Sequence, residues 1–164
     1  MTDARTAPSL APSLAPSPAP SPAPSPDPSA GTRTAVAELL TRIAEGDPGR
    51  VAELFAERVD WRIAANPVVP WIRPRATRAD VAAHFAELAA GVESAPDNRR
   101  AVETVLVDGE DAVIMGMLRG HVRATGKGFH SPYAMRLTVR EGRVVRYHLY
   151  EDSLAIAEAC TPGT

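Results

Sequence analysis

The sequence holds 164 residues with a formal net charge of −2, and it contains one cysteine. This length suits one compact domain with a tail, and the charge argues against the basic surface that nucleic-acid binding requires. The lone cysteine excludes a disulfide framework and a cysteine-based zinc site, and no apolar run approaches the roughly 18 residues of a membrane span.

Residues 1–31 form a proline-rich stretch built on a near-repeat of Ala-Pro-Ser. A segment of this composition has little to bury and favours extended polyproline conformations. We therefore predict a disordered tail over residues 1–31 and a folded domain over residues 32–164; a ligand for an SH3-like groove is the alternative interpretation of the tail. The start of the chain lacks the basic and apolar segments of a secretory signal, so the predicted location is the cytoplasm.

Amphipathic helices are predicted in the first half of the domain. The first begins near Thr32, because apolar residues recur at intervals of three and four, and Gly46 ends it. Asp47 and the proline after it begin the second, and a capping box of Thr77 and Asp80 begins the third. The expected buried stripes are Val36, Leu39, Leu40 and Ile43; Val51, Leu54 and Phe55; and Val81, Phe85, Leu88 and Val92.

Strands dominate the second half. A short strand is predicted over 59–65, followed by an irregular loop with three prolines over 66–74. Another strand is expected over 100–107, and alternating apolar residues then predict an antiparallel meander from 111 to 152. Helices early and strands late indicate an α+β fold, with helices on one face of a curved sheet and a pocket between the two layers.

Two connections decide which side chains of the last three strands share a face. A two-residue turn at Thr125-Gly126 and a three-residue loop over 140–142 predict three cross-strand rows on the inner face. The alternative is a two-residue turn at Glu141-Gly142, which flips the last strand and turns His148, Tyr150 and Asp152 inward. We prefer the first register, because the second buries Arg146 without a partner. The rows are Gly116–Met135–Tyr147, Leu118–Tyr133–Leu149 and Gly120–Ser131–Glu151.

The order of these elements resembles the SnoaL-like branch of the nuclear-transport-factor-2 (NTF2)-like superfamily, which includes ketosteroid isomerases. The segments that carry the resemblance are AEGDPGRVAELFAERVDWRI, TRADVAAHFAELAAG and EGRVVRYHLYEDSLAIAEA. The resemblance implies a cone-shaped fold with an apolar pocket between the sheet and the N-terminal helices. It leaves the activity open, because this fold serves cyclases, isomerases, epoxide hydrolases and non-catalytic association domains.

The catalytic sets of two related enzyme types are missing from the matching positions. The ketosteroid isomerase tyrosine falls at Leu39, and its general-base aspartate falls at Ile63. The second aspartate of that enzyme falls near Ala134 or Met135. The Asp-Arg-Asp set of the epoxide hydrolases falls near Leu118 or Gly120, Gly116 or Leu118, and Leu149. Any acid–base chemistry must therefore use other side chains.

Glu151, His148 and Tyr133 are the predicted catalytic residues. Glu151 is the only carboxylate that the preferred register turns inward, where burial raises the pKa of a carboxyl group toward neutrality. The alternative is that Glu151 lies at the open end of the sheet and is solvated. His148 serves as the base only if the last strand is flipped, and Tyr133 is a hydrogen-bond donor or a core residue. The predicted substrate-binding residues are Trp61, Ile63, Trp71, Phe85, Leu118, Ser131, Met135, Tyr147 and Leu149.

Other polar residues are assigned structural positions. His84 is interpreted as a residue on the flank of the third helix, and four scattered histidines without paired spacing argue against a metal site. Met115 and Met117 lie on the outward face of the sheet, where apolar side chains favour a homodimer through that face.

The sequence thus predicts a pocket protein that binds a small hydrophobic molecule and acts as an acid–base enzyme without a cofactor. Cyclase, isomerase and hydrolase types stay open, with a polyketide- or terpenoid-like substrate. The alternative is a non-catalytic ligand-binding or dimerisation domain of the same superfamily.

Overall fold

The computed structural model describes residues 27–94 and 102–163. Among these residues no helix is both long enough and apolar enough to cross a membrane. The elements, in chain order, are α1 (Pro28–Glu45), α2 (Pro48–Ala52), β1 (Phe55–Ile63), α3 (Arg78–Gly91), β2 (Val92–Ser94), β3 (Val102–Asp108), β4 (Asp111–Val122), β5 (Gly128–Arg140), β6 (Arg143–Glu151) and α4 (Ser153–Cys160).

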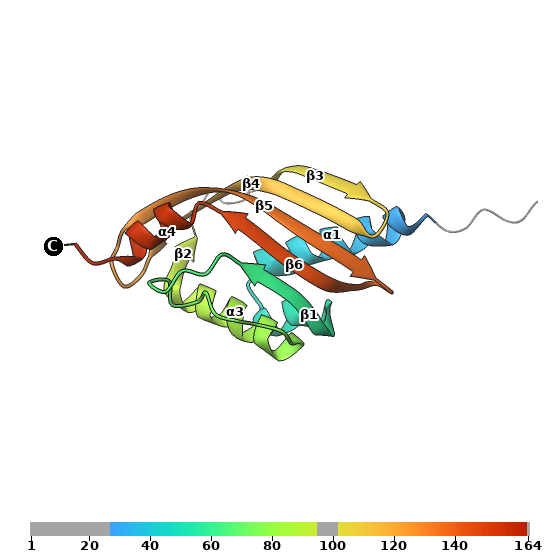
Figure 1. Ribbon diagram of the computed structural model, residues 1–164, viewed down its shortest axis with the longest axis horizontal. Coiled ribbons are helices and arrows are strands. Elements are labelled where there is room, and N and C mark those ends of the chain that lie inside the picture. Colours follow the sequence, from blue (N-terminus) through green and yellow to red (C-terminus); the bar gives the residue numbers. More distant parts are fainter. Residues whose placement is uncertain (1–26, 95–101, 164) are drawn as a thin grey trace, which may run out of the picture.

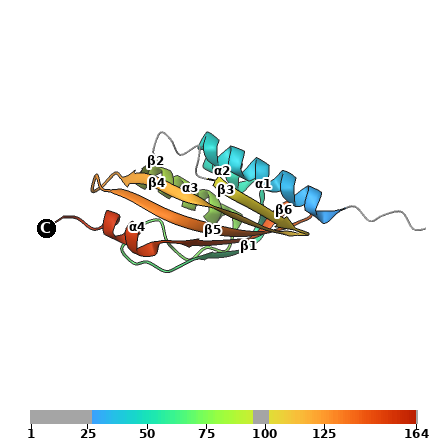
Figure 2. The same cartoon turned by 90° about the horizontal axis from the view of Figure 1, so that it is seen from above.

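The strands form one mixed sheet in the order β1-β6-β5-β4-β2, and β3 pairs with the other half of β4. Only β1 runs parallel to its neighbour, β6; the remaining pairs are antiparallel. The helix α1 lies along one face of the strands, and α4 lies at the end of the molecule opposite the start of α1 (Figures 1 and 2). The predicted α+β fold is confirmed.

The first helix begins earlier than predicted. The Asp27 side chain caps it by accepting a hydrogen bond from the Ser29 amide at 2.9 Å, so the helix starts at Pro28 and not near Thr32. Thr32 is already a buried helical residue, and its hydroxyl donates to the Gly109 carbonyl at 2.8 Å. The folded domain therefore includes residues 27–31. The predicted disorder of the tail otherwise concerns residues 1–26, which lie outside the described part of the chain.

The second helix is shorter than predicted, and the first strand begins earlier. Phe55 does not continue the helical stripe; it pairs with Val144 of β6 and is fully buried. The Val144 amide donates to the Leu54 carbonyl at 2.9 Å, so pairing with β6 outweighs the local helical pattern. The short strand β2 is absent from the sequence prediction. The predicted start of the following strand at 100–101 lies outside the described residues.

The third helix begins at the predicted capping box. The Thr77 hydroxyl accepts from the Asp80 amide at 3.3 Å, and the Asp80 carboxylate accepts from the Thr77 amide at 3.0 Å. The last helix is capped by Asp152, as predicted, through a 3.1 Å hydrogen bond from the Ala155 amide.

The turn between β4 and β5 differs from the predicted one, and it shifts the register. The Val122 amide donates to the Lys127 carbonyl at 2.9 Å, so residues 123–126 form the connection. The Thr125 hydroxyl anchors this turn by donating to the Ala159 carbonyl at 2.6 Å. Gly116 consequently pairs with Tyr133, not with Met135. The shift is two residues, so every side chain keeps its predicted face.

The connection between β5 and β6 is the two-residue turn that was the less favoured alternative. Glu141 and Gly142 both have positive φ, 50° and 71°, as the twist of such a hairpin requires. The flip that this turn should cause is reversed by a bulge, because Thr138 pairs with Arg146 whereas Val139 pairs with Val144. Val145 is the extra residue.

The bulge restores the predicted orientation of the last strand. Tyr147 and Leu149 are buried on the concave face, and Glu151 pairs with Tyr133. The predicted rows are therefore wrong in their partners and right in their faces, since both errors in register amount to an even number of residues.

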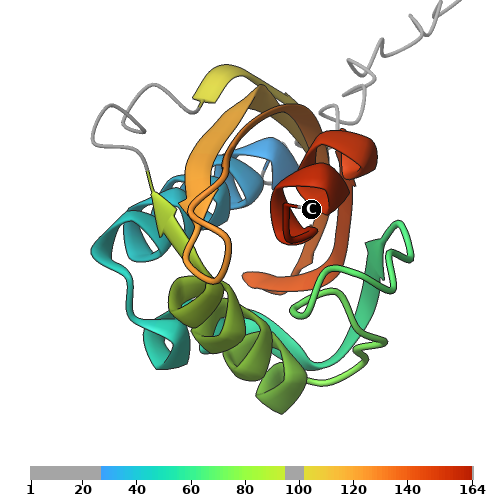
Figure 3. The same cartoon turned by 90° about the vertical axis from the view of Figure 1, so that its left-hand side faces the viewer.

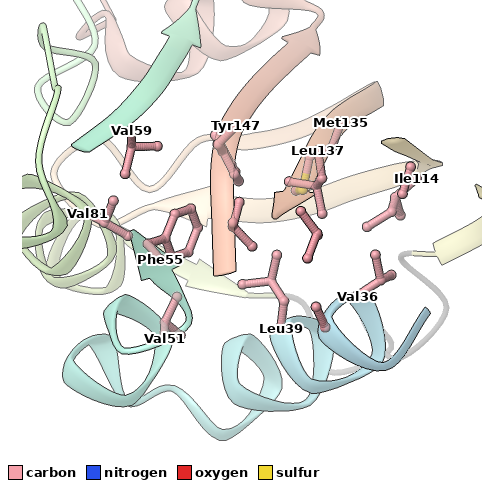
Figure 4. Close-up of a cluster of buried hydrophobic side chains, with 14 of the residues drawn as sticks. Val36, Leu39, Val51, Phe55, Val59, Val81, Ile114, Met135, Leu137 and Tyr147 are labelled. Carbon is pink, nitrogen blue, oxygen red and sulfur yellow. The ribbon is translucent and has the colours of Figure 1, made fainter. Parts of the chain in front are cut away.

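The main core lies between α1 and the concave face of the sheet. Leu39 of α1, Phe55 of β1, Ile114 of β4 and Leu137 of β5 are fully buried there (Figure 4). A second cluster fills the other end, where the segment after β1, the β4–β5 hairpin and α4 meet; it consists of Val69, Trp71, Val122, Phe129, Ile156 and Ala159. The Asn66 amide ties that segment to α4 by donating to the Ser153 carbonyl at 2.9 Å.

Candidate functional site

A cavity of about 280 Å³ lies between the helices and the concave face of the sheet. Figure 3 looks along the molecule from the end that carries α4, with α3, β2 and α4 around the centre of the view. Residues from the α1–α2 connection, α3, β2 and strands β1, β4, β5 and β6 form the wall. The predicted binding residues that line it are Ile63, Trp71, Phe85, Leu118, Met135, Tyr147 and Leu149.

Trp61 supports the wall from behind. Its ring stacks on Tyr147 with centroids 4.2 Å apart and planes 10° apart, and its distance to the ring of His84 is 4.9 Å. Trp61 fixes two lining side chains and does not line the cavity itself, so this geometry gives its predicted role in binding no support. The stacking on Tyr147 covers the face of the Trp61 ring that a ligand would need.

Ser131 and Tyr133 also lie outside the cavity wall. The Ser131 hydroxyl accepts from the Asp152 amide at 2.8 Å and is fully buried, so it anchors the start of α4. Tyr133 pairs with Gly116 and belongs to the main core cluster. The two-residue shift of the β4–β5 turn gives both residues other cross-strand partners than expected, Leu118 for Ser131 and Gly116 for Tyr133.

Trp71 closes one end of the cavity. It is 5% exposed and lines the cavity, and its ring packs so closely on Gly91 that an added Cβ there would lie 2.8 Å from Cζ3. This contact explains why α3 ends in a glycine. The expected place of Trp71 beside a ligand is compatible with this geometry, although the ring serves the second core cluster as well.

Glu151 contributes a carboxyl group to the cavity wall. No hydrogen bond or ion pair joins it to another residue in the described ranges 27–94 and 102–163. Burial raises the pKa of Glu151 to about 7, because an ionised carboxylate is poorly solvated among apolar groups. Both protonation states are consequently populated near neutral pH.

Tyr147 places a phenol close to that carboxyl group. Burial raises the pKa of Tyr147 first, and the charge of Glu151 raises it further, so the hydroxyl keeps its proton. Within the described part of the chain no residue hydrogen-bonds to this hydroxyl. The phenol is therefore a donor that a ligand in the cavity can use.

His148 lies on the outer face of the sheet, as the preferred register places it, and it does not line the cavity, so this geometry gives its predicted catalytic role no support. Its Nε2 is 2.9 Å from Asp60 Oδ1, and Arg146 Nε donates to Asp60 Oδ2 at 2.8 Å. Contact with His148, followed by the hydrogen bond from Arg146, lowers the pKa of Asp60 to about 2. The bulge at Val145 explains why His148 points outward, since without the bulge this strand would present His148 to the cavity.

His84 is a polar side chain of the cavity wall that sequence reasoning missed. It is 3% exposed, lines the cavity, and brings Nδ1 to 3.2 Å from the Trp71 carbonyl. A carbonyl only accepts, so Nδ1 carries the proton. Burial lowers the pKa of His84 to about 4, which keeps the ring neutral. The available signal was its position three residues after Val81, within the buried stripe of α3.

The described ranges contain no group of three His, Cys, Asp or Glu side chains close enough to hold a metal ion. The side chains of Asp47 and Glu151 both line the cavity, but Asp47 caps α2 through the amides of Gly49 and Arg50. Among the carboxylates of the wall, Glu151 is therefore the one available for chemistry.

The chain resembles known proteins in sequence pattern and in fold. The family model of the SnoaL-like domain matches residues 36–147. An NTF2-like protein from Burkholderia xenovorans LB400 has a TM-score of 0.71 and 24% identity, with 81% of this chain and 98% of that chain covered. No curated protein matches the chain.

Two further solved structures of similar fold come from a ligand complex and from an enzyme. A Catenulispora acidiphila DSM 44928 protein with a ketosteroid isomerase-like fold, in complex with trimethylamine, has a TM-score of 0.62 and 16% identity, covering 79% of this chain and 93% of that chain. An epoxide hydrolase from M. tuberculosis, described as LEH-like, has a TM-score of 0.60 and 11% identity, covering 80% and 90%. At these identities the likeness is one of fold.

Proposed function

We propose that this chain, which belongs to the SnoaL-like domain family, binds a small hydrophobic molecule in its cavity and acts on it by acid–base catalysis without a cofactor. The observation that carries the proposal is an isolated carboxyl group, Glu151, in an apolar cavity with a pKa raised to about 7. A general base is most effective when its pKa is close to the working pH. Glu151 meets that condition.

The chemistry follows from two side chains. Ionised Glu151 takes a proton from a carbon next to a carbonyl group, and the carbonyl oxygen gains the negative charge. The hydroxyl of Tyr147 stabilises this oxyanion by a hydrogen bond, in a cavity from which apolar walls exclude water. Protonated Glu151 then returns the proton to a different carbon, which completes an isomerisation. In a cyclisation, the enolate carbon attacks a second carbonyl of the same polyketide- or terpenoid-like molecule, and protonated Glu151 gives its proton to the alkoxide that this attack forms.

Non-catalytic ligand binding is the second candidate. It is favoured by Leu39 and Ile63, which stand at the positions of the tyrosine and the aspartate of the ketosteroid isomerases that this chain resembles. Leu39 is fully buried in the core, so it cannot contact a ligand.

Cytoplasmic location stays a prediction from the sequence.

Exchange of carbon-bound protons in D₂O tests the proposal directly. We expect the protein to accelerate deuterium incorporation next to the carbonyl of small cyclic ketones such as 2-tetralone, as measured by mass spectrometry. The rate should rise with pH through about 7, because only ionised Glu151 accepts a proton. Ketones that bind without any accelerated exchange would favour the non-catalytic candidate.

We also propose a homodimer through the outer face of the sheet. Met115, Ala134 and Tyr150 form one cross-strand row on that face, where Tyr150 is 54% exposed. Replacing Met117, whose partner on the same face is Pro132, with Asp should shift the dimer toward monomer, because burying an unpaired charge costs several kcal/mol. Met117→Leu is the matched control and should leave the dimer intact. Sedimentation of the wild type as a monomer at micromolar concentration would contradict this proposal.

A further inference from the structure

His84 presents an unused acceptor to the cavity. Its Nδ1 donates to the Trp71 carbonyl at 3.2 Å, so Nε2 of the neutral ring holds a lone pair. Among the residues that the structure describes, none supplies a hydrogen bond to Nε2. His84 lines the cavity, so a hydroxyl of a ligand bound there can supply the donor for this acceptor.

The ring is held in this orientation on more than one side. Trp61 and Phe85 contact it at 4.9 Å and 5.3 Å between centroids, with interplanar angles of 65° and 82°. A ring flip would exchange Nδ1 with Cδ2, so a carbon would face the Trp71 carbonyl and the 3.2 Å bond of Nδ1 would be lost. The free acceptor therefore has a fixed position in the wall, as a selective contact requires.

We propose that His84 determines specificity by accepting a hydrogen bond from a hydroxyl group of the ligand. The proposal rests on the cavity function proposed above and narrows its substrate class to small hydroxylated cyclic ketones and phenols. In this arrangement Tyr147 donates a hydrogen bond to the carbonyl oxygen of the ligand, and Glu151 exchanges the proton on the neighbouring carbon. His84 accepts a hydrogen bond from the hydroxyl group of the ligand. A cavity of about 280 Å³ lies at the small end of ligand sites, which favours molecules of one or two rings.

The variant His84→Asn separates the proposed role in ligand binding from a purely structural role, in which His84 only holds the Trp71 segment. In His84→Asn the side-chain amide can still donate to the Trp71 carbonyl from the position of Nδ1, while the acceptor at Nε2 is lost. The test compares 2-naphthol with 2-methylnaphthalene, which has nearly the same shape and no hydroxyl. Affinities of the full-length wild type, His84→Asn and Glu151→Gln for both probes are measured by calorimetry.

We expect the wild type to prefer 2-naphthol by about tenfold, the typical effect of one hydrogen bond to a buried acceptor. His84→Asn should lose this preference with unchanged affinity for 2-methylnaphthalene, and Glu151→Gln should keep it. Equal binding of the two probes by the wild type, no binding of 2-naphthol, or a preference that survives in His84→Asn would overturn the proposal. Loss of the preference in Glu151→Gln alone would assign the hydroxyl to Glu151 instead.

A second measurement needs no variant. The ¹⁵N chemical shift of His84 Nε2 should move on addition of 2-naphthol and stay in place on addition of 2-methylnaphthalene. An unchanged shift with bound 2-naphthol would also overturn the proposal. If the proposed acid–base function is wrong, the deuterium-exchange experiment shows no accelerated exchange. This outcome is distinct from a failure of the His84 proposal, which shows in the binding of 2-naphthol.

Discussion

Replacing Glu151 with Gln should lower the rate of proton exchange in the cavity by about 10²- to 10⁴-fold, the usual contribution of a general base. The amide keeps the shape and the polarity of the side chain, but it cannot take a proton at neutral pH. The measurement is the initial rate of deuterium incorporation into 2-tetralone at pH 7.5, under saturating ketone.

Glu158→Gln is the matched control for this experiment. Glu158 is an exposed residue of α4, and its loss removes the same formal charge from the same end of the chain. We expect its exchange rate to equal that of the wild type. If Glu151→Gln also retained the full rate, Glu151 would be excluded as the base, whatever its pKa.

Glu151 and His84 should have opposite effects on stability between pH 4.5 and 6.5. The pKa of Glu151 rises from 4.5 to about 7 on folding, so the folded protein binds more protons and the free energy of unfolding falls as pH increases. The pKa of His84 falls from 6.5 to about 4, so the unfolded chain binds more protons and the free energy of unfolding rises. Each change is worth about 3 kcal/mol.

Denaturant unfolding across this pH range separates the two effects. The contributions nearly cancel in the wild type. Glu151→Gln should become less stable toward pH 4.5 by about 2–3 kcal/mol, because only the His84 effect is left, and His84→Asn should show the opposite slope. Parallel profiles for the three proteins would mean that neither side chain is buried as described.

The fold was predictable from local patterns, because strand alternation and helix caps act over a few residues. The faces of β4, β5 and β6 followed from the period of two, and these assignments survive any even shift in register. Cross-strand partners depend on turn geometry. Thr125 anchors its turn to Ala159, 34 residues away, and no local pattern reveals such a contact.

The site was predictable only in part, for similar reasons. Glu151 reached the cavity because two features of the β5–β6 hairpin compensate each other: the two-residue turn flips the strand, and the bulge at Val145 flips it back. His84 was missed because a histidine in the stripe of a helix has the same sequence pattern whether it faces a packed core or a cavity. The packing of Trp71, Trp61 and Phe85 around it decides between the two.

The most direct test of the central claim is the titration of Glu151 itself. The ¹³C chemical shift of its side-chain carboxyl carbon, assigned by comparison with Glu151→Gln, should titrate with a midpoint near 7 in the folded protein. A midpoint near the ordinary value of about 4.3 would show a solvated carboxylate and would contradict the assignment of Glu151 as the base of an apolar cavity.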